Sequence, residues 1–260
     1  MQTALTIAGS DSGGGAGIQA DLKTFAAHGV FGTSAVTAVT AQNTLGVTQV
    51  EVLSPAMVAA QIDAVVSDLR PAATKLGMLA TADIVRTAAD GIARHRLSNV
   101  VLDTVMVAKG GARLISDDAV AAMRDQLLPL ADLVTPNVPE AEALTGLVIR
   151  SIEDMQRAAR QIAGLGAQAV LVKGGHLAGA ATDVLWTGGR MIELTEPRVD
   201  TPHTHGTGCT LSAAITARLA LGDTLEDAVR AAKRYVTLAI QQAPALGKGH
   251  GPLQHFPERT

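Results

Sequence analysis

The chain has little of several features that would place it in common classes of protein. Its one cysteine, Cys209, excludes an intrachain disulfide and a zinc site made of cysteines. Cysteine usage this low favours a reducing compartment. Aromatic residues supply only 2% of the 260 residues, although hydrophobic residues of all kinds supply 47%. The core must therefore consist of Ala, Val, Leu and Ile, which suits helices packed against a parallel sheet.

Concentrated charge and long apolar runs are also missing. The net charge is only -3, and no long run of one sign occurs, which argues against a broad surface for nucleic acid or anionic membrane. The first residues lead into a glycine-rich segment without the basic and apolar regions of a secretory signal. No stretch approaches the roughly 20 apolar residues of a membrane span. We therefore expect a cytoplasmic protein that binds neither nucleic acid nor membrane.

What is present is an alternation of short apolar runs with amphipathic stretches. Strands are expected at 5–8, 33–40, 74–77, 100–103, 133–135 and 170–173. One helix is expected to follow the first glycine-rich loop and to end near residue 28. Further helices are expected at 54–69, 82–94, 117–128, 152–165, 206–221 and 225–242. Residues 181–194 break this order, because Thr187-Gly188-Gly189 is typical of a hairpin turn. This order predicts a mostly parallel sheet with helices on both faces, and without an internal linker we expect one domain over 1–260.

Residues with chemical potential recur where the predicted strands end. In sheets of this kind, ligands bind beyond the carboxyl ends of the strands. The residues that end or follow predicted strands are Gly9, Gln42, Met78, Asp103, Asn137 and Lys173. The convergence predicts a binding site at that edge of the sheet.

Two glycine-containing segments could approach a ligand through their backbone. Residues 9–17 look like a phosphate loop but match neither of the common nucleotide fingerprints. They form either a plain turn before a helix or a surface on which a flat ligand can lie against bare backbone. His205-Gly206-Thr207-Gly208-Cys209 opens an apolar helix, whose free N–H groups and dipole suit a phosphoryl group. The same dipole is expected to lower the pKa of Cys209 toward the thiolate, although a lone cysteine is usually inert.

Three charged residues suit phosphate chemistry. Asp103 and Glu140 follow or end strands, and two carboxylates beside ATP phosphates can hold Mg²⁺. Glu140 could instead be a favourable acid in the first turn of a helix. Lys173 could bind phosphate or simply be a solvated strand end. His203 and His205 resemble a pair of metal ligands, but no clear third ligand accompanies them.

Longer motifs resemble a known family. The chain is similar to the hydroxymethylpyrimidine/phosphomethylpyrimidine kinases of thiamine biosynthesis, within the ribokinase superfamily. The likeness runs through AGSDSGGGAGIQADLKT, TAQNT, KLGML, VMVAKGG, TPNVPEAEAL, VKGGH and HGTGCTLSAAI. It implies a three-layer α/β fold, ATP with Mg²⁺, a homodimer, and phosphorylation of a hydroxymethyl group followed by phosphorylation of the monophosphate. One departure lies at Asp103-Thr104-Val105, where the family pattern has proline in the middle and so fixes the local backbone.

The resemblance also implies roles for individual residues. Gln42 and Asp21 would hydrogen-bond the aminopyrimidine, and the residues lining its ring would be Gly9, Ala16, Met78 and Val105. Cys209 would stand where sugar kinases of the superfamily have an aspartate base. The anion hole would consist of Gly206, Thr207 and Gly208. Lys173 and Asn137 would face the nucleotide phosphates, and Asp103 and Glu140 would serve the metal.

Other functions remain open at this point. A pyridoxine or pyridoxal kinase shares the fold and phosphorylates a similar heteroaromatic alcohol. A catalytically silent pyrimidine-binding sensor could keep the ring pocket, but it would not need Lys173, Glu140, Asp103 and Cys209. A sugar kinase is disfavoured by Cys209, and a dehydrogenase by the lack of GxGxxG after a strand.

Overall fold

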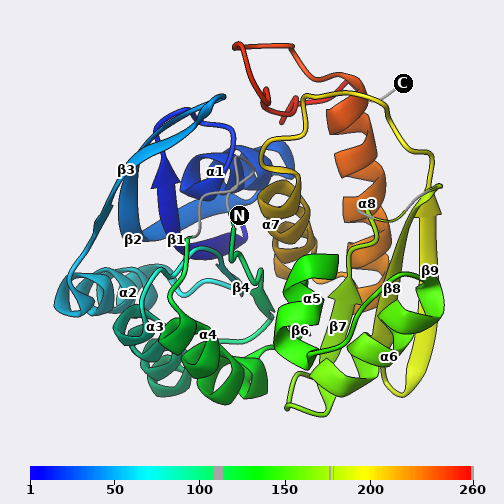
Figure 1. The fold of residues 1–260 in the computed structure, drawn as a ribbon. Coiled ribbons are helices and arrows are strands. Elements are labelled where there is room, and N and C mark those ends of the chain that lie inside the picture. The colour runs from blue at the N-terminus through cyan, green and yellow to red at the C-terminus, as the bar shows by residue number, and fades with distance from the viewer. Residues whose placement is uncertain (108–113, 176, 178, 259–260) are drawn as a thin grey trace.

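The computed structural model describes residues 1–107, 114–175, 177 and 179–258, and in it a single nine-stranded sheet organises the chain (Figure 1). Across the sheet the strands follow the order β3-β2-β1-β4-β5-β6-β7-β8-β9. Their bounds are β1 (Thr3–Asp11), β2 (Phe31–Asn43), β3 (Gly46–Val52), β4 (Ala73–Leu76), β5 (Val100–Leu102), β6 (Leu133–Val134), β7 (Ala169–Val172), β8 (Ala181–Thr187) and β9 (Arg190–Glu196).

The sheet is parallel from β2 to β7 and antiparallel at both edges. β3 pairs antiparallel with β2, and β8 and β9 extend the other edge as an antiparallel hairpin. The expected mostly parallel sheet and the hairpin near residue 188 are therefore both confirmed.

Helices cover both faces of the sheet and make the fold three-layered. The helices are α1 (Gly17–Ala27), α2 (Pro55–Leu69), α3 (Ala82–His95), α4 (Asp117–Ala122), α5 (Val138–Thr145), α6 (Ile152–Ala163), α7 (Thr207–Ala220) and α8 (Leu225–Gln241). Helices α1, α7 and α8 pack on one face, and α2 to α6 pack on the other (Figure 1). The expected helix at 117–128 is only partly right, because α4 continues as a π-helical turn, Met123–Leu127, and a short 3₁₀ turn, Leu128–Leu130.

The central strands contribute side chains to two hydrophobic cores, one on each face of the sheet. In β5, Val100 and Leu102 join the core beneath α2 to α6, while Val101 joins the core beneath α1, α7 and α8. Successive side chains of a strand point to opposite faces, so a strand buried on both sides must be apolar throughout. These cores consist mainly of Ala, Val, Leu and Ile, as the scarcity of aromatic residues predicts.

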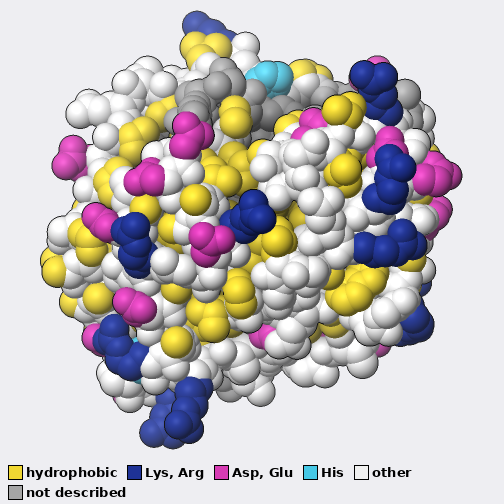
Figure 2. Space-filling view, turned by 60° about the horizontal axis from the view of Figure 1, so that its bottom comes forward, with side chains coloured by type: hydrophobic (Ala, Val, Ile, Leu, Met, Phe, Trp, Pro, Cys, Tyr) yellow, Lys and Arg dark blue, Asp and Glu magenta, His cyan; other side chains and the backbone are white. Residues whose placement is uncertain are grey.

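Charged side chains of both signs are interspersed on the surface that Figure 2 shows. This agrees with the small net charge of the chain. Within the part of the chain that the structure describes, no helix has both the length and the apolar character needed to cross a membrane.

Two strands extend further than the sequence patterns predict. β1 continues through a register shift between Ala8 and Ser10, so Gly9 lies within the strand. β2 continues to Asn43 because it pairs with β3, an element that the sequence patterns do not predict, so Gln42 also lies within a strand. The expectation that Gly9 and Gln42 follow their strands is therefore wrong, although both still face the predicted edge of the sheet.

Candidate active site

A cavity of about 1150 Å³ lies at the carboxyl ends of the central strands. Its volume exceeds that of many small-molecule sites, and it has room for two ligands side by side. All but one of the site residues expected from the sequence line it: Gly9, Ala16, Gln42, Met78, Asp103, Val105, Asn137, Glu140, Lys173, Gly206, Thr207, Gly208 and Cys209.

Asp21 is the exception. Its side chain on α1 is fully buried, with both carboxylate oxygens accepting hydrogen bonds from Lys75 Nζ at 2.9 and 2.8 Å. Thr6 Oγ1 donates a further bond to Asp21 at 2.7 Å. The expectation of direct contact with a pyrimidine is therefore wrong for Asp21 in this structure, because its oxygens are occupied behind the cavity wall. Lys75 lines the cavity in its place.

The glycine-rich segment after β1 is organised by Asp11. The carboxylate of Asp11 accepts hydrogen bonds from the backbone N–H groups of Gly13, Gly15 and Ala16, and from His205 Nε2. Burial by itself would raise the pKa of Asp11, but these donors hold it below its ordinary value. N–H groups that already donate to a carboxylate do not offer a free phosphate nest. These three N–H groups are therefore not free to bind a phosphate in this structure.

The same segment packs closely against the start of α7. Gly206 caps the helix with a φ of 82°, and a Cβ at this position would lie 1.8 Å from the carbonyl oxygen of Gly15. Only glycine fits there, on grounds of both backbone conformation and space. Further along the first turn, a Cβ at Gly208 would lie 3.3 Å from Lys173 Nζ. The N-terminal end of α7 therefore lies next to the cation expected to bind phosphate.

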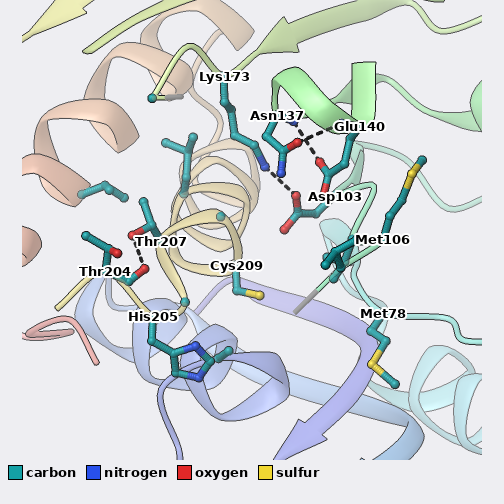
Figure 3. Close-up of a pocket in the computed structure, with 18 of the residues that line it drawn as sticks. Met78, Asp103, Met106, Asn137, Glu140, Lys173, Thr204, His205, Thr207 and Cys209 are labelled. Atoms are coloured by element: carbon teal, nitrogen blue, oxygen red, sulfur yellow. Dashed lines mark hydrogen bonds and ion pairs between the residues drawn. The ribbon is translucent and has the colours of Figure 1, made fainter. Parts of the chain in front are cut away.

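Lys173, Asp103 and Glu140 gather on one wall of the cavity (Figure 3). Lys173 Nζ donates to Asp103 Oδ1 at 2.9 Å, and Asp103 also accepts from Ser212 at 3.3 Å. Although burial raises the pKa of Asp103, the charges of Lys173 and Lys75 hold it below its ordinary value, so this carboxylate is ionised. Burial likewise raises the pKa of Glu140, and here it prevails.

Asn137 and Glu140 hold each other at the start of α5. Asn137 Oδ1 accepts from the N–H of Glu140 at 2.9 Å, and Glu140 Oε2 accepts from the N–H of Asn137 at 2.8 Å. This capping box fixes both side chains at the cavity wall. Thr104 Oγ1, which stands where the family pattern has proline, donates to the same Glu140 oxygen at 2.9 Å.

The donor set fits a hydrated Mg²⁺. The carboxylates of Asp103 and Glu140 both line the cavity beside Lys173, and Mg²⁺ usually keeps several waters and takes one or two carboxylates. Among the described residues no group of three or more His, Cys, Asp or Glu could enclose a metal ion by itself. Any magnesium here would therefore depend on phosphate oxygens for much of its coordination. His205 Nε2 lies 2.9 Å from Asp11 Oδ2, so this ring nitrogen is already occupied by a carboxylate.

Cys209 lies in the first turn of α7, between the Asp103–Lys173 group and Met78 in the view of Figure 3. Burial raises the pKa of its thiol to about 11, even though the charge of Lys75 and the N–H of Gly17 act to lower it. The expectation of a lowered pKa from the helix dipole is therefore wrong for the protein without ligands. Desolvation of the thiolate outweighs the favourable helix end.

The remaining site residues are Gly9, Ala16, Met78 and Val105, and with the polar side chain of Gln42 they line the part of the cavity that we call the ring slot. A Cβ on Gly9 would lie 3.4 Å from Met78 Sδ, so the backbone of Gly9 lies close to the Met78 side chain. Gln42 Oε1 accepts from Thr40 Oγ1 at 3.1 Å, and Gln42 Nε2 lies 3.4 Å from His205 Nε2. The ring slot therefore combines apolar side chains with one amide that can both donate and accept hydrogen bonds.

Sequence reasoning missed several residues of this site. Lys75 interrupts the buried strand β4 and should have stood out as a charge in an apolar run. Asp11 and His205 are brought together only by the fold, and nothing in their sequence spacing indicates the contact. Asp183 and Lys233, a second buried ion pair on the cavity wall, are likewise distant in sequence.

Comparisons with known proteins agree with this geometry. The family model described as phosphomethylpyrimidine kinase matches residues 11–254. The chain is 51% identical over 261 residues to the hydroxymethylpyrimidine/phosphomethylpyrimidine kinase of Haemophilus influenzae, covering 98% of this chain and 97% of the relative.

Solved structures are similar over nearly the same span. The ADP complex of Bacillus subtilis pyridoxal kinase superposes with a TM-score of 0.92 at 43% identity, covering 98% of this chain and 97% of that one. The phosphomethylpyrimidine kinase of Clostridium difficile gives a TM-score of 0.83 at 44% identity, covering 92% of this chain and 100% of that one. By sequence and by fold, the chain belongs to the phosphomethylpyrimidine kinase family.

Proposed function

We propose that this protein uses ATP to phosphorylate 4-amino-5-hydroxymethyl-2-methylpyrimidine and then phosphorylates the monophosphate to the diphosphate, in thiamine biosynthesis. The observation that carries the proposal is a cavity lined both by the residues of the ring slot and by Lys173 and the N-terminal end of α7. A ring in the slot would present its hydroxymethyl group to the phosphate-binding side. The names of the relatives support the same substrate.

In the ring slot, Gln42 would hydrogen-bond the polar edge of the pyrimidine, since its amide can both donate and accept. The side chains and backbone packed on the ring would be those of Gly9, Ala16, Met78 and Val105. Asp21 would act only through Lys75, to which both its oxygens are bound.

On the phosphate side, positioning and charge stabilisation would supply most of the catalysis. Lys173 and Asn137 would face the phosphates of ATP, and the N–H groups of Gly206, Thr207 and Gly208 would stabilise charge on the transferring phosphoryl group. Asp103 and Glu140 would hold Mg²⁺, which would neutralise charge on the nucleotide when it is bound. The ADP complex of the similar pyridoxal kinase supports an adenine nucleotide as the phosphate donor.

Cys209 would take the proton from the hydroxymethyl oxygen as that oxygen attacks the terminal phosphorus of ATP. The bond to the leaving ADP breaks, and the proton later passes from the thiol to solvent. Because the thiol pKa is about 11 without ligands, only a small fraction of the resting protein holds the thiolate. The second phosphorylation needs no such base, because a phosphate oxygen is already charged at neutral pH.

Pyridoxal kinase is the second candidate, favoured by the high similarity to the Bacillus subtilis enzyme of that name. Both rings are flat heteroaromatics that carry a hydroxymethyl group. A silent pyrimidine sensor fits less well, because it would have no use for the buried Lys173–Asp103 pair facing the phosphate side.

Three further properties belong to the proposal and rest on the family resemblance. Residues 1–260 would form one kinase domain, the active protein would be a homodimer, and it would work in the cytoplasm. Sedimentation equilibrium across a concentration series would test the dimer directly.

A substrate panel tests the proposed function. ADP release would be measured with ATP and Mg²⁺ against hydroxymethylpyrimidine, its monophosphate, pyridoxal and ribose. We expect turnover with both pyrimidines and none with ribose. Turnover with pyridoxal and with no other compound would favour the second candidate. If none of the four compounds is turned over, the sensor would be favoured.

A further inference from the structure

The chain just after β7 is tied to the neighbouring strand by a side chain rather than by sheet backbone. The antiparallel pairing of β7 with β8 ends at Val172 and Val184. Two residues further on, the N–H of Gly174 donates to Asp183 Oδ1 at 2.9 Å. The other carboxylate oxygen, Oδ2, accepts from Lys233 Nζ on α8 at 2.7 Å. One carboxylate therefore joins the end of β7, the strand β8 and the helix α8.

This carboxylate and its cationic partner are both buried. Asp183 is 6% exposed and Lys233 is 8% exposed. A buried ion pair often adds no net stability relative to apolar residues of similar volume, so stability alone is a weak reason for its presence. Both residues line the cavity, although the pyrimidine and phosphate roles proposed above use neither. The pair is therefore a candidate for a role in the site.

The acceptor matters because the residue that it holds must be glycine. A Cβ at Gly174 would lie 1.9 Å from the carbonyl oxygen of Thr182 on β8, so no side chain fits between the two backbones. Glycine has the greatest conformational freedom of any residue, and its position must be fixed by its contacts. The hydrogen bond to Asp183 supplies such a contact.

The position of Gly174 bears directly on Lys173, the residue before it. The N–H of Lys173 donates to the carbonyl oxygen of Pro136 at 2.8 Å, so two consecutive N–H groups are held by two different elements. At the far end of the side chain, Lys173 Nζ donates to Asp103 Oδ1 at 2.9 Å (Figure 3). A Cβ at Gly208 would lie 3.3 Å from the same Nζ. Contacts this close leave the ammonium little freedom, so a shift of its backbone would displace it.

We propose that Asp183 is a positioning residue for phosphoryl transfer. By accepting from the N–H of Gly174, it fixes the backbone from which Lys173 reaches the phosphates of the nucleotide. Lys233 holds the carboxylate in place and need not contact the nucleotide itself. The inference rests on the proposed function for the role of Lys173, but its effect on nucleotide binding is measurable without a pyrimidine.

Two double variants isolate the hydrogen bond from the charges. Asp183→Asn/Lys233→Met keeps an oxygen that can accept from Gly174, whereas Asp183→Leu/Lys233→Met has none. Both variants lack both charges, and Asn and Leu are similar in size. Because a small misplacement of a reacting or stabilising group costs up to about 100-fold in rate, we expect kcat/KM for ATP to be roughly 10- to 100-fold lower in the Leu variant than in the Asn variant.

The two ligands are titrated separately by calorimetry. With Mg²⁺ and the non-hydrolysable analogue AMP-PCP, in the absence of pyrimidine, the Leu variant should bind at least several-fold more weakly than the Asn variant. With hydroxymethylpyrimidine, in the absence of nucleotide, the two variants should agree within twofold. A residue that merely stabilises the fold would not separate the two ligands. The loss of kcat/KM for ATP should be equal with hydroxymethylpyrimidine and with its monophosphate, because both steps use Lys173.

Three results would overturn the proposal. The first is equal AMP-PCP affinity and equal kcat/KM in the two double variants. If both are weakened alike relative to wild type, the charge of Lys233 acts on the nucleotide by itself. The second is a loss of pyrimidine affinity as large as the loss of AMP-PCP affinity. The third is a loss of kcat/KM confined to one of the two phosphorylation steps.

Two further outcomes are covered by the same design. If the Leu variant does not fold, Asp183→Val/Lys233→Met takes its place, since a β-branched residue suits a strand and also lacks an acceptor. If the AMP-PCP affinities differ as expected in a protein that phosphorylates neither pyrimidine, the proposed function is contradicted and the positioning role of Asp183 is supported.

Discussion

His205 Nε2 lies 2.9 Å from Asp11 Oδ2, and this contact joins the residue before the α7 cap to the glycine-rich segment across 194 positions of sequence. The same carboxylate accepts from three backbone N–H groups of that segment. Asp11 therefore holds the glycine-rich segment and the start of α7 together.

Asp11→Ala should disturb both stability and pyrimidine binding. It leaves three N–H groups and a buried histidine without their acceptor, which should cost roughly 2–4 kcal/mol of unfolding free energy. We also expect the KM for the pyrimidine to rise. Urea unfolding and steady-state kinetics measure the two effects. Asp90→Ala, at an exposed position on α3, is the control, and an Asp11 variant as stable as this control would contradict the anchor role.

Gln42→Ala should weaken pyrimidine binding. The loss of ring hydrogen bonds costs roughly 0.5–1.5 kcal/mol each, or about 2- to 13-fold in affinity per bond. Calorimetric titration with hydroxymethylpyrimidine measures the change. Gln49→Ala, at an exposed position on β3, is the matched control. Affinity that is equal in the two variants would remove Gln42 from the ring site.

Lys173→Met should reduce turnover and spare the ring slot. The variant loses the cation beside Asp103, and loss of one group that stabilises a transition state lowers kcat by roughly 100-fold or more. Pyrimidine affinity measured without ATP should stay within twofold of wild type, since Lys173 lies on the phosphate side. If a folded Lys173→Met protein no longer bound the pyrimidine, the division of the cavity into two sides would be wrong.

His255 should make stability depend on pH. Burial lowers the pKa of this histidine to about 4, while its ordinary value is 6.5. The folded state therefore binds fewer protons than the unfolded state between these values, so stability is lost as the pH falls from about 6.5 to about 4. The full effect is roughly 3 kcal/mol. His255→Gln should flatten this slope in urea unfolding at several pH values, and a slope equal to that of wild type would assign the acid sensitivity to other groups.

Local signals predicted most of the architecture. Ser54 and Pro55 mark the start of α2, and the Ser54 side chain accepts from the N–H of Met57 as expected of an N-cap. Apolar residues in α2 and α3 recur at helical spacing. The turn at Thr187–Gly189 joins the two strands of the edge hairpin. These elements are determined by interactions between residues close in sequence, so a local sequence pattern can predict them.

The parts that escaped prediction depend on distant contacts. β3 is an edge strand that exists by pairing with β2, and its exposed residues carry no clear apolar pattern. Asp21 was expected in the ring site because its sequence position matches the family, but its partner Lys75 lies 54 residues away. The pKa of Cys209 depends on burial, which the first turn of a helix does not reveal by itself.

The most direct test of the account is to follow the phosphorylated products over time. Hydroxymethylpyrimidine, ATP and Mg²⁺ would be incubated with the protein, and phosphorus NMR would identify each product. The account predicts that the pyrimidine monophosphate appears first and then declines as the diphosphate accumulates. Failure to form any phosphorylated pyrimidine, under conditions in which the protein is folded, would contradict the central claim.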